Sequence, residues 1–304
     1  NNVKQIALAM HNYHDTYKTF PCFLTRNGQN SYWRGYSAFT AILPQMEQAP
    51  LYDAVVAGSS NFYFNWDEGG AAFANLYNAR ASRVPAYICP SARRYNTNGT
   101  GWSNGPGCNY GVSFGSTIKW DDFRQQNGFF RGQSDTNKNA KCSTGMSDII
   151  DGTSNTLMLS EHLSGDDNAN FLMGGQTSEP RIGNAFAGAI QYPSVAEIET
   201  FGIACKAITA HNSQNGNQWM SPEPTQTILN TVAPPNWQYP NCQTSGSGFA
   251  SDRDGIYTAR SQHSGGVNAA YGDGSVRFIT QTIDVKTYQF IGGRDDGQTV
   301  AGPE

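Results

Sequence analysis

Long apolar runs, clustered basic residues and closely spaced cysteine pairs are all missing from this sequence. No stretch approaches the roughly 20 apolar residues that a membrane-spanning helix needs, so the chain as given is predicted to be soluble. Charged residues make up only 14% and the net charge is −4, with no basic stripe to neutralise phosphates. Nucleic acid is therefore excluded as a partner.

The cysteines occur without the Cys-x-x-Cys spacing that zinc or haem sites use, so a metal site has no local motif to support it. Two interpretations remain: buried thiols in a cytosolic protein, or up to three disulfides in an exported one. The even number and the surrounding Gly/Pro/Asn-rich sequence favour disulfides, although the sequence does not choose the pairing. The candidates are Cys22, Cys89, Cys108, Cys142, Cys205 and Cys242.

The first 17 residues have the apolar spacing of an amphipathic helix. Its apolar stripe runs from Val3 through Met10 to Tyr17 and is wide enough to be covered by a sheet. Leu8 falls on the polar side, which on an opening helix suggests contact with another subunit. The candidate contact residues are Leu8, Ala9, Lys4 and His11.

Short elements separated by Gly, Asn and Asp clusters follow, without regular alternation of strands and helices and without a repeat. The predicted class is therefore α+β, with a mainly antiparallel sheet and long decorated loops. Residues 212–238 are polar and contain prolines, which predicts a long surface excursion. Further helices are predicted within 37–46, 71–83 and 195–203, a helix or strand at 283–291, and strands at 87–90, 109–114, 128–131, 156–163 and 185–192.

A β-hairpin is predicted near the C-terminal end. Alternating apolar residues at 267–271 and 276–278 flank Asp273-Gly274, a pair that favours a tight turn because glycine adopts positive φ without steric penalty. His263 stands nine residues before Asp273, which makes a His-x9-Asp-Gly pattern.

The opening helix and this pattern together resemble a family of large prepilin-like proteins. Segments 41–48, 87–91 and 151–157 also resemble that family, in order along the chain. The resemblance implies residues 1–20 as the C-terminal half of a spine helix and 21–291 as one pilin-like domain. Residues 292–304 are polar, and we expect them to form a weakly ordered tail unless they are bound. It also implies an apolar half-helix upstream, through which alone the protein would meet a membrane.

This resemblance implies a structural subunit of an extracellular, cell-surface pilus-like filament or of a secretion-associated (pseudopilin) assembly. Such a protein self-associates and is not an enzyme. An alternative is a cell-surface module that binds a glycan or a protein through aromatic loops. Its candidate residues are Tyr32, Trp33, Tyr63, Trp66, Trp102, Trp219 and Trp237.

A serine hydrolase is a more remote alternative. Residues 111–115 fit Gly-x-Ser-x-Gly around Ser113, and Asp148, Asp151 or Glu161 and then His263 follow in hydrolase order. That motif needs a strand feeding a sharp turn into a helix, and residues 115–120 are a poor helix start.

For His263 we expect a structural clasp that folds back over the hairpin to a carbonyl or to a carboxylate such as Glu161; a share in a metal site is the alternative. No cofactor is expected, except that Asp252 and Asp254 are weak candidates for calcium. They do not complete the spacing of a calcium loop.

Overall fold

The computed structural model describes residues 1–25, 35–58, 71–93, 95, 105–120, 122, 124–132, 142–165, 179–180, 186–209, 211–244 and 253–298. The helices are α1 (Asn2–Tyr17), α2 (Ala38–Ala41), α3 (Ala49–Gly58), α4 (Ala71–Ala81), α5 (Val195–Lys206) and α6 (Val285–Gly292). Short 3-10 helices are η1 (Leu43–Met46), η2 (Pro85–Tyr87) and η4 (Met146–Asp148). No helix in this part of the chain is both long and apolar enough to cross a membrane.

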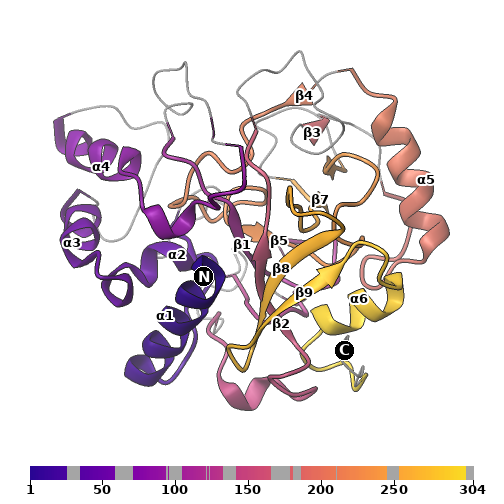
Figure 1. The fold of residues 1–304 in the computed structure, drawn as a ribbon, viewed down its shortest axis with the longest axis horizontal. Coiled ribbons are helices and arrows are strands. Elements are labelled where there is room, and N and C mark those ends of the chain that lie inside the picture. Colours follow the sequence, from indigo (N-terminus) through magenta and orange to yellow (C-terminus); the bar gives the residue numbers. More distant parts are fainter. Residues whose placement is uncertain are drawn as a thin grey trace.

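A five-stranded sheet in the order β5-β1-β2-β8-β9 forms the centre of the molecule (Figure 1). All of its neighbouring strands are antiparallel except β1 and β5, which run parallel. The predicted α+β class with a mainly antiparallel sheet is confirmed. Its strands are β1 (Tyr110–Ser113), β2 (Leu157–Glu161), β5 (Ile228–Leu229), β8 (Gly266–Tyr271) and β9 (Val276–Thr280); two small sheets pair β3 (Glu179–Pro180) with β4 (His211–Asn212) and β6 (Cys242–Gln243) with β7 (Gly255–Ile256).

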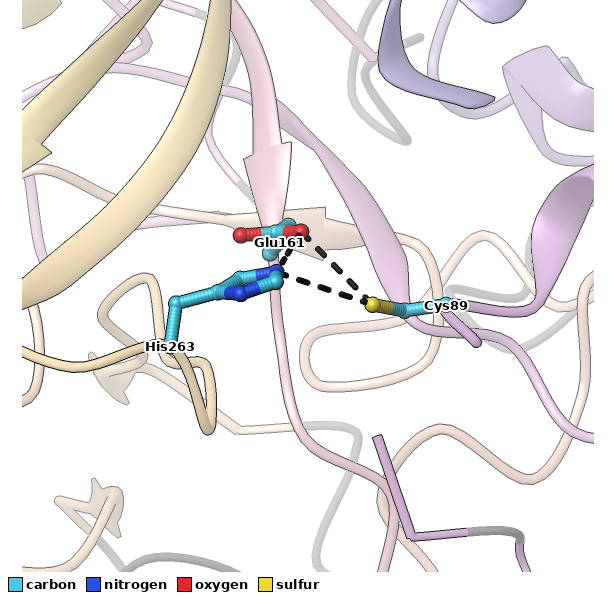
Figure 2. A group of neighbouring side chains, drawn as sticks. All are labelled: Cys89, Glu161 and His263. Atoms are coloured by element: carbon cyan, nitrogen blue, oxygen red, sulfur yellow. Dashed lines mark hydrogen bonds and ion pairs between the residues drawn. The ribbon is translucent and has the colours of Figure 1, made fainter. Parts of the chain in front are cut away.

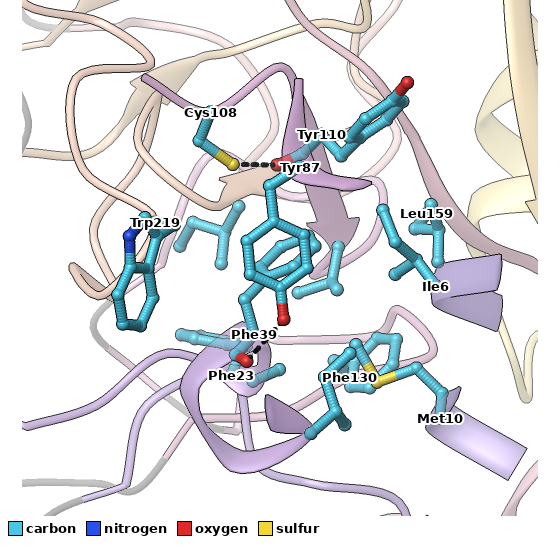
Figure 3. Close-up of a cluster of buried hydrophobic side chains, with 14 of the residues drawn as sticks. Ile6, Met10, Phe23, Phe39, Tyr87, Cys108, Tyr110, Phe130, Leu159 and Trp219 are labelled. Carbon is cyan, nitrogen blue, oxygen red and sulfur yellow. Dashed lines mark hydrogen bonds between the residues drawn. The ribbon is translucent and has the colours of Figure 1, made fainter. Parts of the chain in front are cut away.

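Apolar side chains cover both faces of this sheet. On one face, Ile6 and Met10 of α1 pack with Leu159 in the largest core cluster (Figure 3). On the other face, Val267 of β8 and Tyr288 of α6 belong to a separate cluster. Because both sides are covered, the central strands β1 and β2 are buried at every position, whereas the edge strand β9 is largely exposed.

The elements with the strongest local signals form where they were predicted. Helix α1 covers the predicted amphipathic segment, although Tyr17 is 58% exposed and so lies outside the buried stripe. Ser194 caps α5 by accepting from the Glu197 N–H, while the Glu197 carboxylate accepts from the Ser194 N–H. In the hairpin of β8 and β9, Gly274 has φ 77° in the turn.

Residues 212–238 were predicted to lie on the surface, which is wrong. Almost all of residues 213–237 are buried, and Trp219 lies in the main core. Polar side chains here form hydrogen bonds with backbone groups of neighbouring segments. The Asn230 side-chain amide donates to the carbonyls of Thr117 and Gly255 and accepts from the Tyr257 N–H. A prediction from hydropathy places such residues at the surface. A side-chain amide whose hydrogen bonds are all formed can nevertheless be buried at little cost in free energy.

Three predicted strands are also absent from the described residues. Residues 85–87 form a 3-10 helix because Pro85 suits its first turn, and the Tyr87 hydroxyl then donates to the Phe39 carbonyl at 2.8 Å. At 128–131 the backbone turns and buries Phe129 and Phe130. The segment at 185–192 contributes one isolated bridge, between Gln191 and Thr117; its residue 185 lies outside the described residues.

The beginning of the C-terminal tail is firmly attached, contrary to the prediction of weak order. The buried Arg294 guanidinium donates to the carbonyls of Gln126 and Gly128. The Asp151 carboxylate accepts from the backbone N–H groups of Asp296 and Gly297. Residues 299–304 of the predicted tail lie outside the described residues.

Candidate functional site

Three chemically reactive side chains from distant parts of the sequence meet at the end of strand β2 (Figure 2). The His263 Nε2 atom lies 3.2 Å from Glu161 Oε1 and 4.0 Å from Cys89 Sγ. Cys89 Sγ lies 3.7 Å from the same Glu161 oxygen. Among the described residues, these three form the one group of His, Cys, Asp or Glu side chains that lie close enough together to hold a metal ion.

Backbone hydrogen bonds hold each of the three in place. Glu161 is the last residue of β2, and its Oε2 accepts from the Asn268 N–H of β8 at 2.7 Å. His263 precedes β8, and its N–H donates to the Ser261 hydroxyl. Cys89 follows η2, and its N–H donates to the Asn109 side chain at 3.0 Å. The sheet therefore fixes the carboxylate, and two loops bring the other groups to it.

The site is mostly shielded from water. The Glu161 side chain is 4% exposed, whereas that of His263 is 32% exposed and so provides the route from solvent. Burial raises the pKa of the Cys89 thiol, and the Glu161 charge adds to this effect, while a hydrogen bond with the Ser91 backbone counteracts part of it. Cys89 is consequently a neutral thiol at neutral pH when nothing else is bound.

This geometry differs from that of a catalytic Cys-His-acid triad. In a triad, one imidazole nitrogen faces the nucleophile and the other is oriented by the acid. Here both the thiol and the carboxylate face His263 Nε2, so a single nitrogen serves both contacts. The arrangement suits a hydrogen-bonded clasp or the binding of a metal ion.

The two parts of the His-x9-Asp-Gly pattern lie in different places. His263 contacts Glu161, while the Asp273 carboxylate accepts from the Ser275 N–H inside the hairpin turn. That turn rests on α1, because Lys4 Nζ donates to the Gly274 carbonyl at 2.6 Å. A Cβ at Gly274 would lie 3.3 Å from His11 Nε2.

Contacts of α1 correct part of the predicted assembly face. Leu8 is 55% exposed, but Ala9 is 1% exposed and belongs to the core. Lys4 and His11 contact the hairpin of their own chain at the Gly274 turn, although Lys4 stays exposed and His11 is only partly buried. Leu8 and Lys4 thus remain exposed among the four candidates, and Leu8 lines a hollow of about 270 Å³. A second hollow of about 630 Å³ shares Gln5, Met46 and Ala86 with the first.

Two of the six cysteines were wrongly offered as disulfide candidates. Cys22 is bonded to Cys142 and Cys205 to Cys242. Cys89 and Cys108 are free and buried. Their thiols have other partners, since Cys89 Sγ contacts Glu161 and Cys108 Sγ donates to the Tyr110 carbonyl.

The remaining candidate residues find structural partners or lie outside the described residues. The Asp254 carboxylate forms an ion pair with the ammonium of Lys119. Asp252 lies outside the described residues. Trp219 and Trp237 are core residues, which removes them from an aromatic binding surface. Tyr32, Trp33, Tyr63, Trp66 and Trp102 also lie outside the described residues.

Ser113 lacks the setting of a hydrolase nucleophile. It is fully buried at the end of β1, and its hydroxyl accepts from the Gly115 N–H. Residues 114–120 are described throughout and contain no helix after this strand, whereas a nucleophile elbow leads directly into one. The two glycines of the motif serve close packing instead, as Gly115 does against Gly128.

Cys89 is the functional candidate that sequence patterns could not place. It lies 72 residues from Glu161 and 174 from His263, so no local spacing relates them. The one available signal was the resemblance of segment 87–91 to the family, which does not tell a thiol ligand from a disulfide partner.

His162, next to Glu161, makes folding stability depend on pH. Burial lowers its pKa from 6.5 to about 4, while its Nε2 lies 3.1 Å from the Gln226 carbonyl. The folded state thus favours neutral imidazole, and the unfolded state binds more protons between pH 6.5 and 4. We expect about 3 kcal/mol of stability to be present above pH 6.5 and lost as the pH falls to about 4.

Urea denaturation of the wild type and of His162→Gln across pH 4–7 would measure this loss. The variant should lack that part of the pH dependence, while His14→Gln, which alters a partly buried histidine on α1, should keep it. Parallel curves for the wild type and His162→Gln would contradict the assignment.

Residues 1–286 match the sequence model of a family described as protein of unknown function (DUF1559). No curated protein and no solved structure matches the chain.

Proposed function

The chain belongs to the DUF1559 family, and we propose that it is a structural subunit of an extracellular filament or of a secretion-associated assembly. The proposal is drawn from this membership, from the resemblance of the chain's ends to prepilin-like proteins and from the surface of α1. Copies would associate through α1. The two disulfides support export, because such bonds persist in oxidising compartments.

The observation that carries this proposal is the asymmetric environment of α1. One side of the helix is anchored in the core by Ile6 and Met10, so the helix is held rigidly. The other side leaves Leu8 more than half exposed beside a hollow that residues of η1 and η2 also line. A rigid helix with a protruding leucine next to an unfilled groove is suited to contact another copy.

The groove extends past the protruding leucine, which matters for the symmetry of assembly. It consists of the two hollows, which share lining residues, and it reaches from Asn12 and Glu47 to Arg83 and Pro90. Leu8 of one copy can therefore bind at a displaced position on the next copy. Head-to-tail contacts of this kind build a helical filament when the rotation between successive copies does not close into a ring.

Replacing Leu8 by glutamate tests the proposal. Burying a leucine contributes roughly 1.5–3 kcal/mol, so Leu8→Glu should weaken each contact by roughly 10–150-fold and reduce the recovered filaments accordingly. Surface material sheared from producing cells would be examined by negative-stain electron microscopy and sedimentation. The matched control is Ile203→Glu on α5, where an equally exposed side chain (61%) lies on another helix.

Filament yield should fall for Leu8→Glu and remain at the wild-type level for Ile203→Glu. Wild-type protein that leaves the cell only as a monomer would refute assembly as the function. Equal filament yields from both variants would instead refute α1 as the contact surface.

A further inference from the structure

We propose that Cys89, Glu161 and His263 form a binding site for a thiophilic divalent cation, with Zn²⁺ as the ion that fits. Their three ligand atoms lie within 4.8 Å of one another and point toward a common centre (Figure 2). They come from the segment after η2, from β2 and from the segment before β8, so a bound ion would join three distant parts of the chain.

The spacing of the ligand atoms agrees with tetrahedral zinc. With bonds of about 2.0–2.3 Å, two ligands of such an ion lie roughly 3.4–3.6 Å apart. The observed separations are 3.2, 3.7 and 4.0 Å. Side-chain adjustments of a few tenths of an ångström would therefore bring all three into coordination, without movement of the backbone.

The type of donor selects the ion. A thiol and an imidazole favour Zn²⁺ over calcium and magnesium, which prefer oxygen ligands alone. Three protein ligands leave a fourth tetrahedral position for water, and the one-third exposed His263 marks the side from which water and the ion can enter.

Neighbouring groups already orient these ligands. Asn268 holds the carboxylate through both its backbone N–H and its side-chain amide, with Oε2 engaged at 2.7 Å by the N–H. Hydrogen bonds of this kind to a ligating carboxylate are typical of established metal sites, where they fix the ligand before the ion arrives.

The competing account is a clasp without metal, in which the same atoms are joined by hydrogen bonds alone. Both accounts fit the 3.2 Å contact between His263 and Glu161. They differ at Cys89, because only metal coordination requires a thiolate bonded to the ion. Spectroscopy of that bond therefore separates them.

Cobalt(II) is the optical probe for this bond. The exported protein, cleared of metal with a chelator, should develop a thiolate-to-cobalt charge-transfer band and intense visible bands of tetrahedral cobalt when Co²⁺ is added. Cys89→Ser should remove the charge-transfer band and weaken zinc binding at least about 10-fold. Cys108→Ser, which changes the other free buried thiol, should leave the band and the affinity unchanged.

X-ray absorption spectroscopy of the zinc-loaded wild-type protein uses no variant, so its result does not depend on whether a variant folds. We expect about one sulfur ligand at about 2.3 Å and nitrogen or oxygen ligands at about 2.0–2.1 Å. A sulfur-free shell, the absence of bound zinc after dialysis, or a cobalt band that survives Cys89→Ser would each overturn the proposal. None of these results depends on whether copies assemble through α1.

Discussion

Gly115→Ala should lower the free energy of unfolding by about 3–5 kcal/mol, whereas Gly265→Ala should lower it by about 1–2 kcal/mol. Both glycines have positive φ, 106° and 82°, so both substitutions incur the conformational penalty. They differ in the space around them. A Cβ at position 115 would lie 2.3 Å from the Gly128 backbone N, while nothing lies within 4 Å at position 265.

The segment facing Gly115 cannot easily move away. Its Gly128 N–H donates to the Phe114 carbonyl, and its Phe130 N–H donates to the Ser113 carbonyl. Arg294 binds the same segment from the other side through the Gly128 carbonyl. An added methyl group must therefore break hydrogen bonds or distort the central strand.

Urea denaturation followed by circular dichroism would measure both variants against the wild type. The difference between the two losses isolates the steric contribution, because the backbone penalty is common to both. Equal losses would mean that the segment at 127–130 yields to the new side chain, contrary to our expectation.

Elements whose evidence is local could be predicted from the sequence. Helix α1 has an apolar stripe, α5 has a capping box at Ser194 and Glu197, and the β8–β9 hairpin has a glycine that suits positive φ at residue 274. In each case the residues that determine the element lie within a few positions of one another, so the pattern is visible in a single segment.

The interior position of residues 213–237 could not be predicted in this way. Its polar side chains find their partners on remote segments, as Asn230 does on Thr117 and Tyr257. A polar residue with a remote hydrogen-bond partner and one in contact with water have the same local sequence signature. Knowledge of the tertiary arrangement is needed to tell them apart.

The candidate site could likewise be predicted from the sequence only in part. Glu161 was among the groups expected near His263, because a carboxylate is a natural partner for an imidazole. Cys89 was expected in a disulfide, since an even number of cysteines gives no indication of which ones stay free. Its position beside Glu161 follows from the course of the chain after η2 and not from its neighbours in sequence.

Removal of the Cys22–Cys142 disulfide by double substitution to serine should lower the free energy of unfolding by about 5 kcal/mol. The bond spans a sequence separation of 120 residues, and in the chain-entropy model a longer closed loop gives larger stabilisation. The Cys205–Cys242 bond spans 37 residues, so its removal should cost about 4 kcal/mol. Denaturant titration of both double variants would compare these losses.

The Cys22–Cys142 bond also joins segments that pack together in the native state. Its removal should therefore weaken the packing of the core residues next to it. The Phe20 N–H donates to the Thr144 carbonyl at 2.8 Å, and the Phe20 ring packs edge-on against Phe129. Alkylation of the denatured, unreduced wild type provides the control and should label Cys89 and Cys108 alone. Labelling of all six cysteines would show that the disulfides do not form, and the proposal of an exported protein would fail with them.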